Sequence, residues 1–600
     1  MHISKTKLTK RLLLCVSIFI ISCSTGEDPE SPIPETPSNA TCDGTISITL
    51  QEIGSDYLNL SWTTDGDFST FDIEYGAKGF TLGQGTRLQA TTPSTELQNL
   101  NPNSEYDVYA RGVCPNSNGG WTNPITFTTQ IDENIFEGHV SLKNQDEVDA
   151  FGAMEYTKVN GSLTITGIWE NNEPYITDLS SLSTLREVTN ILSVEFNPSL
   201  ESLHGLEGLE VVGMLDLELN EMLTSIEPLN GIQQVTGFAS PEGENPAQLR
   251  VASCYNLLSL EGLQNIVEVD YLIIESNYDL VDLNGLRGIT NVSKDLTIKS
   301  NIQLQSLNGL SQLISVGGNF FLSNIVLESL DGLESLESIG GELEILGNNA
   351  LTSISAIGNL QFVNELVIST NQSLTSLEGI NLDVVQNRLA IVLNGELTDL
   401  SGIKGSSTSA NIFISSCNKL VSLSGLESLE AAGEIFLLHN DSLVSLTGLQ
   451  SLTTINNKFH LEGNSQITSL NGLEKLESVN DLEIIENYGL EDISTLISLN
   501  SVGNTIYISR NENLLSINGL ENIVEANEIS IIKNNLLQSL TGLEGVRTIQ
   551  NGVLVYDNNS LTNFCALDGL INLGGFSGEW NVSSNLFNPT LEDMQNGICN

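Results

Sequence analysis

The repeat that decides the fold is clearest from residue 296, where the chain reads Leu296-Thr297-Ile298-Lys299-Ser300-Asn301, then Leu304, Leu307, Gly309, Leu310, Leu313 and Val316. The same unit, Leu-x-Ile-x-x-Asn-x-x-Leu-x-Ser-Leu-x-Gly-Leu-x-x-Leu-x-x-Val, recurs through residues 161–563. Aligned on the Asn, its copies fall 23 or 24 residues apart, with one interval of 34, at residues 197, 220, 254, 277, 301, 324, 348, 371, 394, 417, 440, 464, 487, 511, 534 and 558. A fixed period of this length predicts a solenoid of stacked coils.

The register predicts the role of each position. Leu-x-Ile is a short strand whose alternate side chains point inward, and successive coils place these strands side by side in a parallel sheet. The Asn is expected to be buried, where its amide satisfies backbone groups of the neighbouring coil. The later leucines recur every three residues, which suits short 3₁₀-like turns. One copy departs from the pattern, because Asn319 stands five residues before Asn324 where the others have an apolar residue.

This pattern resembles leucine-rich repeats, and among them the receptor L domain. Gly161-Ser162-Leu163-Thr164-Ile165 and the recurrent Ser-Leu-x-Gly-Leu carry the resemblance, which covers about 450 residues. It implies a solenoid that presents a binding face and is not catalytic. No ligand-binding residue carries over, since no ligand motif matches.

Residues 42–130 alternate apolar and polar side chains in short runs, which indicates an antiparallel sandwich. Trp62, the segment Leu100–Tyr106 and the following Val108-Tyr109-Ala110-Arg111 resemble a fibronectin type III module. The resemblance implies that the Tyr side chain closes a corner of the sandwich. The predicted fold class is therefore mostly β, a fibronectin type III-like sandwich followed by a long solenoid with one strand per coil. Such modules usually serve as spacers.

Both ends of the solenoid are predicted to be capped. Residues 131–160 form the first cap, with a strand at Phe136–Leu142 and an amphipathic helix at Asn144–Phe151, and residues 564–600 form the second. We expect disulfides between Cys565 and Cys599 and between Cys42 and Cys114, since the protein is predicted to be exported. Cys254 and Cys417 occupy Asn positions seven coils apart, about 34 Å at the strand spacing, and are expected to be free thiols.

The N-terminus predicts export. Residues 1–22 have a basic start and a short apolar run, which is typical of a signal peptide. Ile20-Ile21-Ser22-Cys23 resembles the lipobox of bacterial lipoproteins, which implies lipidation of Cys23. Residues 23–41 are rich in Pro and act as a tether. The chain is therefore expected to be an outer-membrane lipoprotein, anchored to the membrane by lipid and exposed at the surface, with a plain signal peptide as the alternative.

Charge and composition exclude several functions. The formal net charge is −53 and becomes −57 without the four basic residues of the signal, so nucleic acid is not expected as a partner. The chain has only five His, and no HExxH, G-x-S-x-G or P-loop motif. No cofactor, metal or catalytic residue is predicted, although acidic pairs such as Glu342/Glu344 leave an enzyme as a remote alternative.

The outward strand face is the candidate binding site. Residues four and two before the Asn position are predicted to point outward, and exposed aromatic side chains often mark partner sites. The alternative is that aromatic residues simply suit a half-exposed strand. The candidate ligand-binding residues are Phe320, Phe413, Phe436, Leu438, His460 and Tyr507. A second candidate is the 11-residue insertion near residues 238–248, within the only long interval.

The sequence thus favours a non-enzymatic surface lipoprotein whose solenoid binds a protein or glycan, for adhesion, recognition or nutrient capture. A structural scaffold of the cell envelope, with no soluble ligand, is the alternative.

Overall fold

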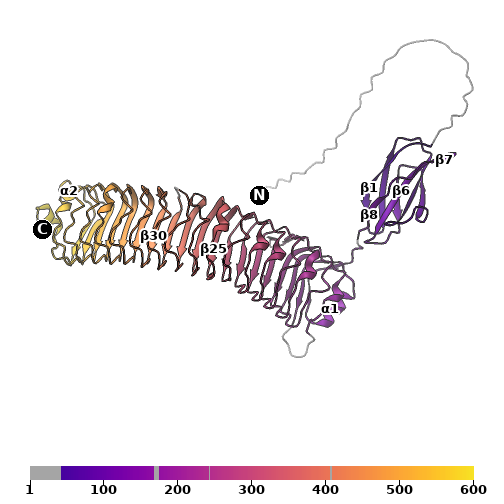
Figure 1. The fold of residues 1–600 in the computed structure, drawn as a ribbon, viewed down its shortest axis with the longest axis horizontal. Helices are drawn as coiled ribbons and strands as arrows, with labels where there is room; N and C mark the ends of the chain where they lie inside the picture. The colour runs from indigo at the N-terminus through magenta and orange to yellow at the C-terminus, as the bar shows by residue number, and fades with distance from the viewer. Residues whose placement is uncertain (1–41, 131, 168–174, 242, 406–408) are drawn as a thin grey trace, which may run out of the picture. The chain divides into compact units, whose positions relative to one another are not determined.

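A computed structural model describes residues 42–130, 132–167, 175–241, 243–405 and 409–600 (Figure 1). The chain divides into two compact units, Met1–Asp132 and Glu133–Asn600. The predicted signal peptide, Cys23 and the tether lie outside the described residues. Among the described residues, no helix has the length and apolar character needed to cross a bilayer.

The first unit is an antiparallel β-sandwich. Its sheets are β1-β2-β5 and β4-β3-β6-β7, and β8 pairs with β6. The bounds are β1 Ile46–Ile53, β2 Tyr57–Thr64, β3 Thr70–Ala77, β4 Thr86–Ala90, β5 Ser94–Gln98, β6 Glu105–Cys114, β7 Ser117–Asn118 and β8 Ile125–Thr128. Trp62 packs edge-to-face on Phe71 in the core, with 5.2 Å between ring centroids. The Tyr106 hydroxyl accepts a hydrogen bond from the backbone N–H of Asn101 (2.9 Å), which closes one corner of the sandwich.

The second unit is a parallel β-solenoid, and its described strands form one 26-stranded sheet apart from a two-stranded hairpin at residues 238–245 (Figure 1). Each coil contributes a strand to the same face. These strands are β12 Leu163–Thr166, β13 Glu187–Glu195, β14 Val211–Glu218, β18 Gln248–Ala252, β20 Tyr271–Glu275, β22 Leu296–Lys299, β24 Phe320–Ser323, β25 Ser338–Leu346, β26 Phe362–Ser369, β27 Val385–Val392, β28 Asn411–Ser415, β30 Glu434–Leu438, β31 Thr454–Glu462, β32 Ser478–Ile485, β33 Ser501–Ser509, β34 Glu528–Ile532, β35 Gly552–Tyr556 and β36 Glu579–Ser583.

Short strands and turns complete the coils. In several coils a two-residue strand precedes the main one: β15 Gln234–Val235, β19 Glu268–Val269, β21 Asn291–Val292, β23 Ser315–Val316 and β29 Ala431–Ala432. Short 3₁₀ turns lie between the main strands of successive coils: η1 Ser180–Leu182, η2 Glu227–Gly231, η3 Asn284–Leu286, η4 Asn308–Leu310, η5 Ser355–Asn359, η6 Leu382–Val384, η7 Ser494–Ser498 and η8 Cys565–Leu567. The three-residue leucine spacing therefore corresponds to turns, as predicted.

Burial follows the repeat register. In the coil at residue 296, Leu296 and Ile298 are fully buried, whereas Thr297 between them is half-buried on the outer surface. The leucines of the turns are fully buried as well, and one continuous apolar core runs from Leu142 to Cys599. Because a single coil cannot bury its own apolar face, the stack is the stable unit.

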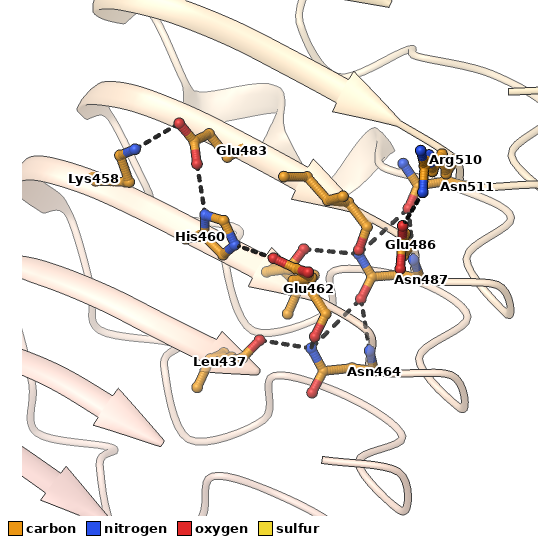
Figure 2. A network of polar contacts seen from close by, with 12 residues as sticks. Leu437, Lys458, His460, Glu462, Asn464, Glu483, Glu486, Asn487, Arg510 and Asn511 are labelled. Carbon is orange, nitrogen blue, oxygen red and sulfur yellow. Dashed lines mark hydrogen bonds and ion pairs between the residues drawn. The ribbon is translucent and has the colours of Figure 1, made fainter. Parts of the chain in front are cut away.

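A ladder of buried asparagines runs along one edge of the core (Figure 2). Asn487 is representative. Its Oδ1 accepts the backbone N–H of Asn464 in the preceding coil (3.0 Å), and its Nδ2 donates to the carbonyl oxygens of Leu461 (2.9 Å) and Ile485 (3.0 Å). Buried polar groups must be paired, and this amide pairs three backbone groups at once. The ladder therefore joins neighbouring coils.

The residue before each ladder position has a left-handed backbone conformation in every described coil, including Ser300 (φ 56°) and Asn324 (φ 54°). Asn324 therefore occupies this turn position, and Ile325 occupies the ladder position: the Ile325 N–H donates to Asn348 Oδ1 (3.2 Å). Asn suits a left-handed turn as well as a buried ladder, so the alignment at Asn324 was wrong by one residue.

The same shift corrects the prediction for Phe320. Phe320 is paired in register with Leu296 and Leu343, and its side chain is fully buried. It belongs to the core and not to the candidate binding face. Its neighbour Phe321 takes the outward position, between Thr297 and Glu344.

Cys254 and Cys417 occupy ladder positions and are free and buried. Burial raises the pKa of both thiols to about 11. Each backbone N–H still donates to the Asn of the next coil, at 3.0 Å in both cases. A thiol lacks the carbonyl oxygen that an Asn offers to the coil before it, so the ladder is weaker at these two coils.

The ends of the solenoid are covered by irregular segments. At the start lie β9 Ile135–Glu137, β10 Val140–Leu142, β11 Lys158–Asn160 and the helix α1 Gln145–Gly152, whose N-cap is Asn144. At the far end, β36 pairs in parallel with β35 and Asn585 extends the ladder by accepting the N–H of Asn558 (3.0 Å). The segment expected to be only a cap therefore contains one further coil, before α3 Leu591–Gln595. The helix α2 Asp568–Asn572 directly follows η8.

Candidate ligand-binding face

The side chains between the buried positions of each strand form columns on the outer face of the sheet. Strand registers place one column at the strand centres: Ser193, Asp216, Arg250, Ile273, Thr297, Phe321, Glu344, Val367, Ala390, Phe413, Phe436, His460, Glu483, Tyr507, Ser530 and Leu554. The column is rigid, because every strand beneath it is paired on both sides.

Three aromatic rings of this column lie next to one another. Phe413 and Phe436 have ring centroids 5.8 Å apart, and Phe436 and His460 are 5.6 Å apart, with interplanar angles of 41° and 30°. All three side chains are half-buried, as is Leu438 on the strand of Phe436. We call these four residues, Phe413, Phe436, Leu438 and His460, the aromatic patch. Each ring therefore has a neighbouring ring beside it and is only partly open to solvent.

A polar network closes one end of the aromatic patch (Figure 2). Nδ1 of His460 lies 2.5 Å from Glu483 Oε2, and Nε2 lies 2.7 Å from Glu462 Oε2. Lys458 donates to the other oxygen of Glu483 (2.6 Å). Both ring nitrogens of His460 therefore face carboxylate oxygens. The network fixes the orientation of the His460 ring.

The pKa of Glu483 is affected in two directions. Burial raises it, but the hydrogen bonds from Lys458 and His460, together with their charges, outweigh burial and leave the pKa below its usual value. Glu483 is therefore ionised at neutral pH and contacts both Lys458 and His460 beside the patch.

The remaining predicted residues are distributed as follows. Tyr507 is half-buried and in register with Glu483, which separates it from the aromatic patch. Cys42 and Cys114 form a disulfide in the sandwich, and Cys565 and Cys599 form one in the last coil. The acidic network around the patch was missed, because sequence register places Lys458 and Glu462 on the face without showing which groups they contact.

The insertion in the long interval forms a small hairpin, β16 Phe238–Ser240 with β17 Gly243–Asn245. Beside its base lies a cavity of about 880 Å³, whose lining includes Gln234, Thr236 and Asp270. Asp270 accepts hydrogen bonds from the Ala247 N–H (2.8 Å) and from the Ser293 hydroxyl. Its carboxylate thus holds the chain where it returns from the hairpin to the main sheet.

Only one cluster among the described residues has the composition of a metal site, namely Cys565, Asp568 and Cys599. Both cysteines are in a disulfide, so no thiolate is available to bind a cation. The cluster is part of the covalent closure of the last coil.

Comparison with known families agrees with both units. Residues 45–128 match the fibronectin type III domain. Residues 157–285 match the receptor L domain. The sandwich is thus a fibronectin type III domain, and the receptor L domain match covers the first coils of the solenoid. Both are domain types of receptor and binding proteins. The aromatic patch lies outside the matched receptor L segment.

Solved structures give only weak likenesses. The fibronectin type III domains FN1–FN3 of chicken CNTN1 are 23% identical over 14% of this chain and 29% of that one, with a TM-score of 0.13. A leucine-rich repeat protein from Bacteroides eggerthii is 11% identical over 76% of this chain and 87% of that one, with a TM-score of 0.26. Pectate lyase Pel3 from Pectobacterium carotovorum is 10% identical over 54% and 85%, with a TM-score of 0.12. A search of curated proteins gave no match.

Proposed function

We propose that this protein is a non-enzymatic surface receptor that binds a protein partner through the aromatic patch of its solenoid. The observation that carries the proposal is the contiguous row of Phe413, Phe436 and His460, with Leu438 beside it, on the outward face. Aromatic side chains on such a face are the residues that dominate protein interfaces.

The geometry favours protein over glycan at this patch. A sugar ring binds flat on an open aromatic face, but each of these rings is half-buried and has a neighbouring ring 5.6–5.8 Å away, centroid to centroid. Half-buried rings beside Leu438 suit the apolar side chains of a protein. The carboxylates of Glu434 and Glu462 flank the patch, and the chain is strongly acidic. The partner is therefore expected to carry basic residues around an apolar centre.

The test is an array of extracellular proteins probed with the purified solenoid, followed by titration of each protein that binds. Replacing both Phe413 and Phe436 with Ser should weaken binding at least tenfold. Phe321→Ser is the matched control, since Phe321 is half-buried in the same column but remote from the patch. Equal binding by the double variant and the wild type would dismiss the patch.

The proposal also includes a location. Lipidation at Cys23 would hold the chain on the outer membrane, with residues 23–41 as tether and the fibronectin type III domain as spacer. A Cys23→Ala variant should be recovered in the soluble fraction, and protease added to intact cells should degrade the wild-type protein. Complete protection of the wild type in intact cells, with degradation after lysis, would contradict surface display.

A further inference from the structure

A second concave site lies on the edge of the solenoid, beside the asparagine ladder and away from the strand face. It is a groove of about 570 Å³. Its lining is polar apart from one aromatic ring and consists of Tyr488, Arg510, Glu512, Lys533, Asn535, Asp557 and Asn559. These residues come from four successive coils, so at about 4.8 Å per coil the groove is roughly 15 Å long.

The two walls of the groove are the positions directly before and directly after the ladder residue. The position before it is left-handed in every described coil, which suits Gly, Asn or small residues. In this groove it is held by Arg510 (φ 57°), Lys533 (φ 59°) and Asp557 (φ 60°). The turn does not need long charged side chains, so folding alone does not account for this run of charges.

Half of the polar side chains in the groove are available to a ligand. Arg510 is paired with Glu486 (2.5 Å), and Asn559 donates to the side chain of Asn535 (2.8 Å). Within the described chain, no ion pair or side-chain hydrogen bond engages Lys533, Glu512 or Asp557. The ring of Tyr488 is 46% exposed. The groove thus offers donors, acceptors and one open aromatic ring.

The lining carries charges of both signs, since Lys533 and the Glu486-paired Arg510 stand with Glu512 and Asp557. A ligand of high charge of either sign would meet a group of like charge in the same groove. A neutral molecule with many hydroxyl groups can instead accept from the cations and amides and donate to the carboxylates. The apolar face of a sugar ring can then rest on Tyr488.

We propose that this groove binds a neutral oligosaccharide. Tyr488 supplies the stacking surface, and Lys533, Asp557 and Asn535 supply hydrogen bonds to hydroxyl groups. The groove is separate from the aromatic patch, so the two sites act independently. The chain then has a protein-binding face and a glycan-binding edge on one solenoid.

The test is isothermal titration calorimetry of the purified solenoid with cellotetraose, xylotetraose, mannotetraose and laminaritetraose, and with tetragalacturonate as the charged comparison. At least one neutral sugar should bind, and Tyr488→Ala or Lys533→Ala should weaken its binding at least tenfold. Tyr278→Ala is the matched control, because Tyr278 holds the same repeat position in a distant coil and is 42% exposed.

The control and the Phe413/Phe436 double variant should bind the sugar as the wild type does. Thermal unfolding midpoints should be unchanged for Tyr488→Ala, Lys533→Ala and Tyr278→Ala, since these side chains are exposed on the surface. The proposal is overturned if no neutral sugar binds at millimolar concentration, if only tetragalacturonate binds, or if Tyr488→Ala binds normally.

Discussion

The buried ladder edge and the outward strand face come from the same repeat, yet they tolerate very different residues. Along the ladder, nearly every position holds Asn, with Cys254, Ile325 and Cys417 as the departures. The central column of the face holds Ser, Asp, Arg, Thr, Phe, His, Tyr and Leu in register with one another. One column must pair buried backbone groups, whereas the other meets solvent.

This difference shows at which positions the amino-acid type can vary without loss of the fold. A ladder residue is chosen by three backbone hydrogen bonds that only an amide makes together. A face residue needs only to suit a strand, so its identity is available for recognition. The aromatic patch and the polar groove both use positions that folding leaves open. The following substitutions test this division, in order of decreasing effect.

The largest difference in the free energy of unfolding is expected between substitutions of two adjacent phenylalanines, whose side chains lie on opposite faces of one strand. Phe320→Ala should lower the free energy of unfolding by about 3–5 kcal/mol, because it leaves a cavity in the core. Phe321→Ala should cost less than about 1 kcal/mol, because that side chain is on the outer face. Guanidinium unfolding of both variants measures the difference. Equal losses would mean that β24 is in a different register.

The next effect concerns the ladder itself. Asn487→Ala should lower the free energy of unfolding by about 2–3 kcal/mol, because it strands the Asn464 N–H and the Leu461 carbonyl inside the protein. Tyr488→Ala, one residue along and exposed, should change it by less than about 0.5 kcal/mol. A loss below about 1 kcal/mol for Asn487→Ala would show that water replaces the amide.

A smaller gain is expected where the ladder is interrupted. Cys417→Asn should raise the free energy of unfolding by about 0.5–1.5 kcal/mol, because its new Oδ1 lies in place to accept the backbone N–H of Asn394. Cys417→Ala is the control that removes the thiol without adding an acceptor, and it should not stabilise. Thermal unfolding of the two variants compares them directly. A destabilised Asn variant would show that the coil has adapted its packing to sulfur.

The smallest change in the free energy of unfolding is expected at Glu483, on the outward strand face. Its folded pKa lies below the unfolded value of about 4.3, so its ion pairs stabilise the protein at neutral pH and are lost as pH falls through the folded value. Glu483→Gln should cost less than about 1 kcal/mol at pH 7. The difference from wild type should shrink below about pH 4.5. If the difference in the free energy of unfolding stays constant from pH 7 to pH 3, the charge of Glu483 does not stabilise the protein.

Much of the architecture was predictable because its chemistry is local in the repeat. Leu-x-Ile and the Asn that follows it give the parallel sheet and the ladder directly. The register failed at Asn324, where one residue type suits two adjacent positions. The last coil escaped notice because Asn585 follows Asn558 after 27 residues and Trp580 replaces the usual Leu.

The candidate sites were predictable only in part. Repeat register places Phe413, Phe436 and His460 in one column, and the structure adds that their rings lie 5.6–5.8 Å apart, centroid to centroid. The repeat register does not predict the hydrogen-bond partners of His460, because these depend on side-chain conformation. The polar groove was missed because it uses the positions beside the ladder residue, where Arg510 and Lys533 look like ordinary surface charges.

The direction of the ladder hydrogen bonds has a consequence for how the number of coils can change during evolution. From Asn440 to Asn511, each Asn accepts from the coil before it and donates its own N–H to the coil after it, so the coils of this run receive and offer the same bonds. Removing or duplicating one complete coil would preserve both junctions. The reach of the solenoid is therefore a matter of copy number, and recombination within the gene can lengthen or shorten it without designing a new core.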